Sequence, residues 1–199
     1  MPSRRAVALL LASTALLALS ACTSGAPTPD DTPAVTTPQA DISGEWVVTR
    51  TVATSNDTTN PARAVGATSV RYVLVDREAC DDALCPGTVT SGAAADTREK
   101  TSLTQTDGGF EYTFTGALDC MNTTTGGVLF VDGFDFEQTA KLTVGAVTDA
   151  DGKATASTLT GTIEYSDTVT PAALDAGCTR DPLAVAVGYT VTAERPPVG

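Results

Sequence analysis

The sequence contains no histidine among its 199 residues. Ser-His-Asp and Cys-His catalysis, histidine-ligated zinc or copper sites and histidine-based pH switches all need an imidazole, so each of them is excluded. The chain also lacks the Gly-x-Ser-x-Gly, Ser-x-x-Lys and glycine-rich phosphate-loop motifs of hydrolases, penicillin-binding proteins and nucleotide-binding proteins. We therefore expect a protein that is not an enzyme and that needs no cofactor or metal.

Basic residues are also scarce. Twelve Lys and Arg stand against 24 Asp and Glu, which gives a formal net charge of −12. Loss of Arg4 and Arg5 with an N-terminal leader would bring this charge to 10 − 24 = −14. Because such a negative field repels phosphate groups, we expect neither nucleic acid nor anionic lipid headgroups as partners.

The N-terminus has the pattern of an export signal. Arg4 and Arg5 precede a predominantly apolar run, Ala6 to Leu19, and the small residues Ser20 and Ala21 follow it. A helix of these 14 apolar positions would be about 21 Å long, which is short of the ~30 Å hydrocarbon core of a membrane. Residues 1–21 are therefore predicted to be a cleaved signal peptide rather than a membrane span.

The residues Leu19-Ser20-Ala21-Cys22 resemble the bacterial lipobox. The resemblance implies that the Cys22 thiol receives a diacylglyceryl group and becomes the new N-terminus, which would anchor the protein to the extracytoplasmic face of the cell membrane. The alternative is an ordinary secretory signal with Cys22 as a disulfide partner. Cysteine parity favours lipidation, because removing Cys22 from the five cysteines leaves four that can pair.

A proline- and threonine-rich segment follows the lipobox. Residues 23–40 contain four prolines and no large apolar residue except Val35, so they cannot bury enough apolar surface to offset the entropy of ordering. We expect residues 22–40 to form a disordered tether and residues 41–199 to form one domain. In this N-terminal part the composition is similar to that of cell-envelope lipoproteins from high-GC Gram-positive bacteria.

A two-residue hydrophobic period dominates the domain, and no sustained helical period follows the leader. The strongest example is the parity shared by Phe134, Phe136, Ala140 and Leu142, which indicates a long strand with one buried face. The predicted strands are 46–54, 69–77, 87–91, 101–106, 110–115, 134–146, 154–166 and 183–192.

Short turns separate these strands. Asp107-Gly108-Gly109, Asp132-Gly133 and Asp149-Ala150-Asp151-Gly152 are each typical of hairpin turns. About eight strands joined in sequence order predict an all-β domain, a single antiparallel up-and-down β-barrel, because closure removes exposed strand edges. The alternative is a two-sheet β-sandwich.

The first predicted strand opens with Gly44-Glu45-Trp46, which resembles the Gly-x-Trp motif of lipocalins and related calycin β-barrels. The resemblance implies that Trp46 lies on the first strand and plugs one end of a barrel. The alternative is that Trp46 is simply a core aromatic residue.

The four remaining cysteines are Cys80, Cys85, Cys120 and Cys178. In an exported chain they favour disulfides, for which three pairings are possible. We prefer Cys80–Cys85 with Cys120–Cys178, because the compact EACDDALCPG segment makes a local bridge easy. A four-thiolate zinc site is the rival interpretation.

Two functions remain compatible with the sequence, of which we prefer the first and keep the second as the alternative. In the first, the barrel is a binding module for a small apolar or amphipathic, lipid-like ligand, lined or plugged by aromatic residues: Trp46, Phe110, Tyr112, Phe114, Phe134, Phe136 and Tyr189. In the second, the barrel is filled solid and recognises another envelope protein or the cell wall through its outer surface. An eight-stranded barrel is compatible with either interior.

Overall fold

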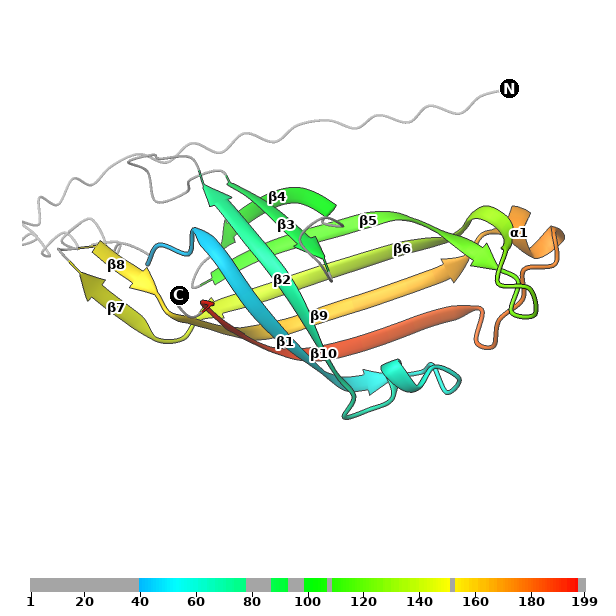
Figure 1. Ribbon diagram of the computed structural model, residues 1–199, viewed down its shortest axis with the longest axis horizontal. Helices are drawn as coiled ribbons and strands as arrows, with labels where there is room; N and C mark the ends of the chain where they lie inside the picture. The colour runs from blue at the N-terminus through cyan, green and yellow to red at the C-terminus, as the bar shows by residue number, and fades with distance from the viewer. Residues whose placement is uncertain (1–39, 78–86, 93–98, 107–108, 151–152, 197–199) are drawn as a thin grey trace, which may run out of the picture. The chain divides into compact units, whose positions relative to one another are not determined.

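The computed structural model describes residues 40–77, 87–92, 99–106, 109–150 and 153–196. Eight of its strands form a closed antiparallel barrel in the order β1-β10-β9-β6-β5-β4-β3-β2 (Figure 1). The barrel strands are β1 (Gly44–Ser55), β2 (Thr68–Arg77), β3 (Gly87–Gly92), β4 (Glu99–Thr106), β5 (Gly109–Met121), β6 (Val128–Val144), β9 (Thr158–Val169) and β10 (Ala184–Glu194). The leader, the tether and Cys22 lie outside the described residues.

The predicted up-and-down barrel is confirmed, and the sandwich alternative is not observed. Each barrel strand pairs with its nearest neighbour along the chain, and β1 closes the ring by pairing with β10 over the register Val47↔Glu194 to Ser55↔Val187. This architecture is compatible with a lipocalin-like fold. Closure gives the first and last strands a partner and removes two edges that would otherwise be open to other chains.

A separate hairpin is inserted between β6 and β9. It consists of β7 (Val147–Ala150) and β8 (Lys153–Ala156), which pair from Val147↔Ala156 to Ala150↔Lys153, and residues 151–152 of the predicted turn lie outside the described residues. The predicted strand 154–166 is therefore divided between β8 and β9. The apolar positions change parity within this stretch, from Ala154 and Ala156 to Leu159 and Ile163, and the chain changes its pairing partner at Ser157.

The hairpin turn predicted at Asp132-Gly133 is wrong, because both residues lie inside β6. The register passes from Leu118↔Phe134 to Cys120↔Phe130, and Asp132 adopts a left-handed φ of 53° in this bulge. A Cβ on Gly133 would lie only 2.7 Å from the Cβ of Cys120, so glycine is required here by a close approach of β5 and β6.

The turn between β5 and β6 is instead built around Asn122. Its side-chain Oδ1 accepts hydrogen bonds from the backbone N–H groups of Thr124 and Thr125, and its backbone carbonyl accepts from the N–H of Gly126. Asparagine stabilises such turns because its short side chain substitutes for a backbone acceptor.

Trp46 lies at one end of the barrel and is buried to 1% exposure. Its Nε1 donates a hydrogen bond to the backbone oxygen of Ile42 (2.8 Å), and the guanidinium of Arg195 lies 4.7 Å from its ring. Arg195 also donates to the carbonyl oxygens of Ser43 (2.8 Å) and Ala156 (2.7 Å). The segment before β1, the end of β8 and the segment after β10 thus close this end around the tryptophan.

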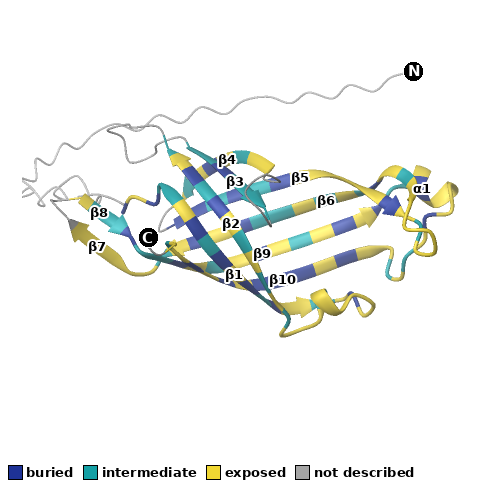
Figure 2. Cartoon of the chain, in the orientation of Figure 1, coloured by how far each residue is buried: buried dark blue, intermediate teal, exposed yellow. Residues whose placement is uncertain are grey.

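Buried residues alternate with exposed or half-buried residues along the barrel strands (Figure 2), and those around Trp46 are apolar. This is the alternation that the sequence predicted, and it concentrates apolar burial in one interior. The buried core includes Val48, Val73, Val75, Val89, Leu103, Phe110, Tyr112, Leu142, Leu159, Ile163 and Val191.

Strands β5, β6, β9 and β10 continue beyond the ends of β1 and β4 toward a second, smaller core (Figure 1). The disulfide Cys120–Cys178 lies there, as predicted, packed with Val169 and with Ala173 of the short helix α1 (Pro171–Asp175). Cys80 and Cys85 lie outside the described residues, so their pairing stays a prediction. In the described part of the chain, no helix has the length and hydropathy needed to cross a membrane.

Candidate ligand site at the barrel mouth

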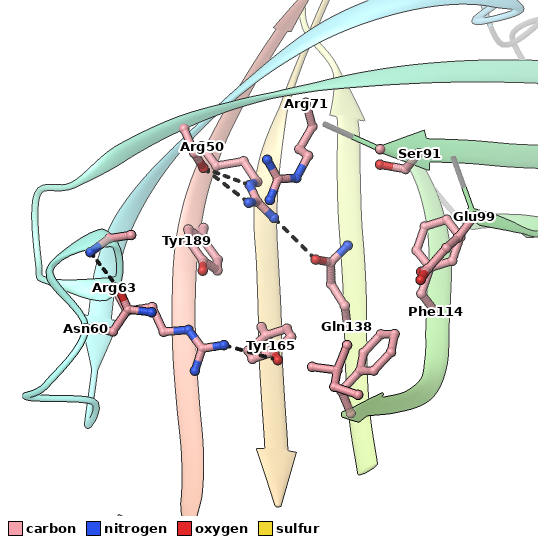
Figure 3. A pocket seen from close by; sticks show the side chains of 15 residues that line it. Arg50, Asn60, Arg63, Arg71, Ser91, Glu99, Phe114, Gln138, Tyr165 and Tyr189 are labelled. Carbon is pink, nitrogen blue, oxygen red and sulfur yellow. Dashed lines mark hydrogen bonds between the residues drawn. The ribbon is translucent and has the colours of Figure 1, made fainter. Parts of the chain in front are cut away.

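A pocket of about 440 Å³ opens at the end of the barrel opposite Trp46 (Figure 3). It is half enclosed, and it is lined by residues from all eight barrel strands and from the loop between β1 and β2. Its lining residues are Arg50, Asn60, Ala62, Arg63, Ser69, Arg71, Ser91, Gly92, Glu99, Phe114, Leu118, Phe136, Gln138, Tyr165 and Tyr189.

The register of β1 and β2 explains why two arginine side chains lie together on the inner wall of the pocket. Arg50 follows the core residue Val48 by two positions on β1, and Arg71 precedes the core residue Val73 by two positions on β2. Both arginines therefore have the parity of the buried face. Arg50 pairs with Ser69 and Arg71 pairs with Val48, so the two arginines are diagonal neighbours on the inner wall.

Arg50 is the most deeply buried cation of the pocket, with 7% of the residue exposed. Its Nε and Nη2 both donate to Oγ of Ser69 at 3.2 Å, and its Nη1 donates to Oε1 of Gln138 at 3.3 Å (Figure 3). The guanidinium also lies 4.8 Å from the ring centroid of Tyr189. Burial lowers the pKa of Arg50, and the positive charge of Arg71 lowers it further.

Neither Arg50 nor Arg71 has a carboxylate within 4 Å among the residues that the structure describes. Arg71 is half-buried, and it donates one hydrogen bond to the backbone oxygen of Val70 (3.2 Å). Glu99 also lines the pocket, but it is exposed and forms no ion pair with another described residue. The pocket wall therefore holds two adjacent guanidinium groups that form no ion pair with a described carboxylate.

Arg63, in contrast, is fully paired. It lies in the 3₁₀ turn η1 (Pro61–Arg63) of the β1–β2 loop, and its guanidinium bridges Asp57 (3.3 Å) and Asp167 (3.2 Å). Asp167 also pairs with Arg180 and accepts a 2.6 Å hydrogen bond from the hydroxyl of Tyr165. This network attaches the loop to β9 beside the pocket.

The same network shifts the pKa values of Asp57 and Tyr165. Burial acts to raise the pKa of Asp57, but hydrogen bonds from Thr59 and Asn60 and the charge of Arg63 outweigh it, so the pKa is lowered. The pKa of Tyr165 is raised by burial and by its hydrogen bond to Asp167. Within the pocket rim, Asp57 is thus held as a carboxylate and Tyr165 as a neutral phenol.

The seven aromatic residues predicted as ligand-binding are distributed over three places. Phe114, Phe136 and Tyr189 line the pocket, whereas the other four do not: Trp46, Phe110 and Tyr112 belong to the main core, and Phe134 packs in the second core.

Sequence reasoning missed the polar residues of the pocket, above all Arg50, Arg71, Gln138 and Tyr165. A signal for Arg50 was present, because it shares the parity of Trp46, Val48 and Val52 in a predicted strand. Charged residues are rarely buried, so an arginine on the buried face of a predicted strand indicates a candidate functional site.

The described residues contain no group of three or more cysteine, aspartate or glutamate side chains placed to hold a metal ion. Comparisons with family models, with curated proteins and with solved structures each found no match to this chain.

Proposed function

We propose that the barrel is a non-catalytic binding module that receives one small amphipathic molecule at its open mouth. The observation that carries the proposal is the half-enclosed pocket of about 440 Å³. Its volume falls in the range of roughly 300–1,000 Å³ that is usual for small-molecule sites. A filled barrel acting only through its outer surface would not need such a space.

The pocket has an apolar side and a polar side. Phe114, Leu118 and Phe136 contribute apolar surface from β5 and β6, and the rings of Phe136 and Tyr165 stack with centroids 6.3 Å apart. Arg50 and Arg71 contribute polar surface from β1 and β2. This division suits a ligand with an apolar body and a polar head. The apolar core between Arg50 and Trp46, which includes Val48 and Val73, is packed and confines that ligand to the mouth.

Filling the pocket tests the proposal. The probe is an environment-sensitive fluorescent amphiphile, titrated against the purified full chain. Ser91→Trp places a large side chain into the pocket and should abolish saturable binding. The matched control is Thr90→Trp, which lies next to it on β3 with its side chain on the opposite face of the strand. Equal binding by the two variants, or no binding by the wild type, would overturn the proposal.

We further propose that the protein is a lipid-anchored lipoprotein on the extracytoplasmic face of the cell membrane. The lipobox-like segment ending at Cys22 supports attachment, and the Cys120–Cys178 disulfide fits an oxidising compartment. Cys22→Ser should move the mature protein from the membrane fraction to the soluble fraction. Mass spectrometry of the wild-type N-terminus should show a diacylglyceryl group, and an unmodified peptide there would contradict the anchor.

A second candidate function is recognition of another envelope protein. It is favoured by the apolar side chains exposed near the β5–β6 turn, namely Met121, Val128, Leu129 and Val131. Leu129→Ser with Val131→Ser should then abolish a specific crosslink to a partner in intact cells. If the crosslinking pattern is unchanged, this candidate is rejected, whatever the result of the probe titration.

A further inference from the structure

We infer that Arg50 and Arg71 form a binding site for the carboxylate of the ligand, so that the ligand class is an amphipathic monocarboxylic acid. The inference rests on the proposed binding function and adds the chemistry of the head group to it. Figure 3 shows the two guanidinium groups side by side on the inner wall, next to Gln138.

The hydrogen bonds of Arg50 leave part of its guanidinium unused. A guanidinium carries five N–H donors, and three of them are directed to only two acceptors, Ser69 and Gln138. These contacts, at 3.2–3.3 Å, are longer than the usual ~2.9–3.0 Å of an N–H···O bond. The two remaining N–H groups have no acceptor among the described residues. An oxyanion in the pocket would satisfy them.

Charge reinforces this conclusion. A buried cation without a counter-ion is costly, and Arg50 has a second cation, Arg71, as its neighbour. Two like charges in a partly desolvated site repel each other. An anion bound between them is attracted by both and offsets this repulsion. Arginine is well suited to this task because its planar fork matches the two oxygens of a carboxylate.

The protein does not supply this anion from its described acidic residues. Asp57 and Asp167 are shared between Arg63 and Arg180, so these four side chains sum to zero charge. Arg50, Arg71 and the nearby Glu99 then leave a single positive charge at the pocket. One carboxylate balances it, whereas a phosphate monoester carries about −1.5 to −2 charges at pH 7.

The position of the two arginines also sets the direction of the ligand. They lie on β1 and β2, while Phe114, Leu118 and Phe136 lie on β5 and β6. A carboxylate held by the arginines therefore leaves the apolar body of the ligand against the β5–β6 wall. This arrangement requires an acid with an apolar chain or ring rather than a small hydrophilic anion.

Calorimetric titration of the full mature chain carrying Cys22→Ser tests the inference. This substitution removes only the proposed lipid attachment site. The probes are decanoate, decanol and decyl phosphate at fixed ionic strength. Decanoate should bind about tenfold or more tightly than decanol, and more tightly than decyl phosphate.

Arg71→Gln should weaken decanoate binding about tenfold and leave decanol binding unchanged. Because Arg71 is only half-buried, this variant is expected to fold. Arg50→Gln should weaken decanoate binding at least as much. The matched control is Lys141→Gln, which removes the same charge from an exposed position on β6.

The outcomes separate the two proposals. Equal binding of decanoate and decanol, or no effect of Arg71→Gln, would overturn the carboxylate site while the binding function stands. Tighter binding of decyl phosphate would overturn the assignment to carboxylic acids. Binding of none of the three probes would contradict the binding function itself, and the carboxylate site with it.

Discussion

The guanidinium of Arg63 lies 3.2 Å from a carboxylate oxygen of Asp167, a residue 104 positions further along the chain. Arg63 belongs to the loop between β1 and β2, and Asp167 lies on the inner face of β9 with 2% exposure. A buried carboxylate is stable only when it is paired and hydrogen-bonded. This contact therefore fixes the loop at the rim of the pocket and compensates the charge of Asp167.

Neutralising Asp167 should destabilise the fold. Asp167→Asn keeps the shape of the side chain but leaves the arginines around it without their buried counter-charge. We expect a loss of about 3 kcal/mol in the free energy of unfolding, measured by urea denaturation. Glu111→Gln is the control, because Glu111 forms an exposed 3.9 Å pair with Lys141 and should cost less than about 1 kcal/mol. Equal effects of the two substitutions would contradict the structural role of Asp167.

Removing the Cys120–Cys178 disulfide should have a larger effect. The bridge spans 58 positions, and the chain-entropy model gives about 4 kcal/mol for a loop of this length. Thermal and urea unfolding of the double variant Cys120→Ser/Cys178→Ser should show this loss. A stability within about 1 kcal/mol of the wild type would show that the second core holds its strands without the bridge.

The pair Cys80–Cys85, predicted from the sequence, can be tested without a structure. Titration of free thiols in the denatured, unreduced mature protein should find none, because Cys22 is lipidated and the other four cysteines are paired. Two free thiols would contradict the Cys80–Cys85 bridge. The expected contribution of this short loop is about 2 kcal/mol.

Alkaline pH should destabilise the barrel through Tyr112. Burial raises the pKa of Tyr112 to about 12, although the charge of Arg50 acts to lower it. An unfolded tyrosine ionises near pH 10. The folded state therefore holds this proton more tightly, so the stability is complete below about pH 10 and falls as the pH rises toward 12, by up to about 3 kcal/mol.

Urea denaturation at several pH values tests whether the free energy of unfolding falls as the pH rises. Tyr112→Phe should remove a large part of the fall between about pH 10 and pH 12, and the rest is expected from Tyr165, whose pKa is also raised. Tyr72→Phe is the matched control, because Tyr72 is exposed on β2 and should leave the profile unchanged. If the wild type and the Tyr112→Phe variant lose stability in parallel, another group causes the alkaline transition.

The alternation of apolar and polar residues was sufficient to predict which side chains of most strands point into the barrel. The parity of Phe110, Tyr112 and Phe114 predicted a buried face, and all three are buried. The sequence did not predict the bulge at Asp132-Gly133, because an Asp-Gly pair is also typical of hairpin turns. Only the long-range pairing of β5 with β6 shows that the chain continues through it.

The sequence alone determined that this chain forms antiparallel strands with one apolar face, that Cys120 and Cys178 can be paired, and that histidine-dependent chemistry is excluded. These properties follow from residue type and from a period of two, which are local. The tertiary structure decided which inward-pointing residues lie at the same height along the barrel and can contact one another. Arg50 and Gln138, 88 positions apart, meet at the pocket only because strand register and ring closure bring β1 and β6 around a common interior.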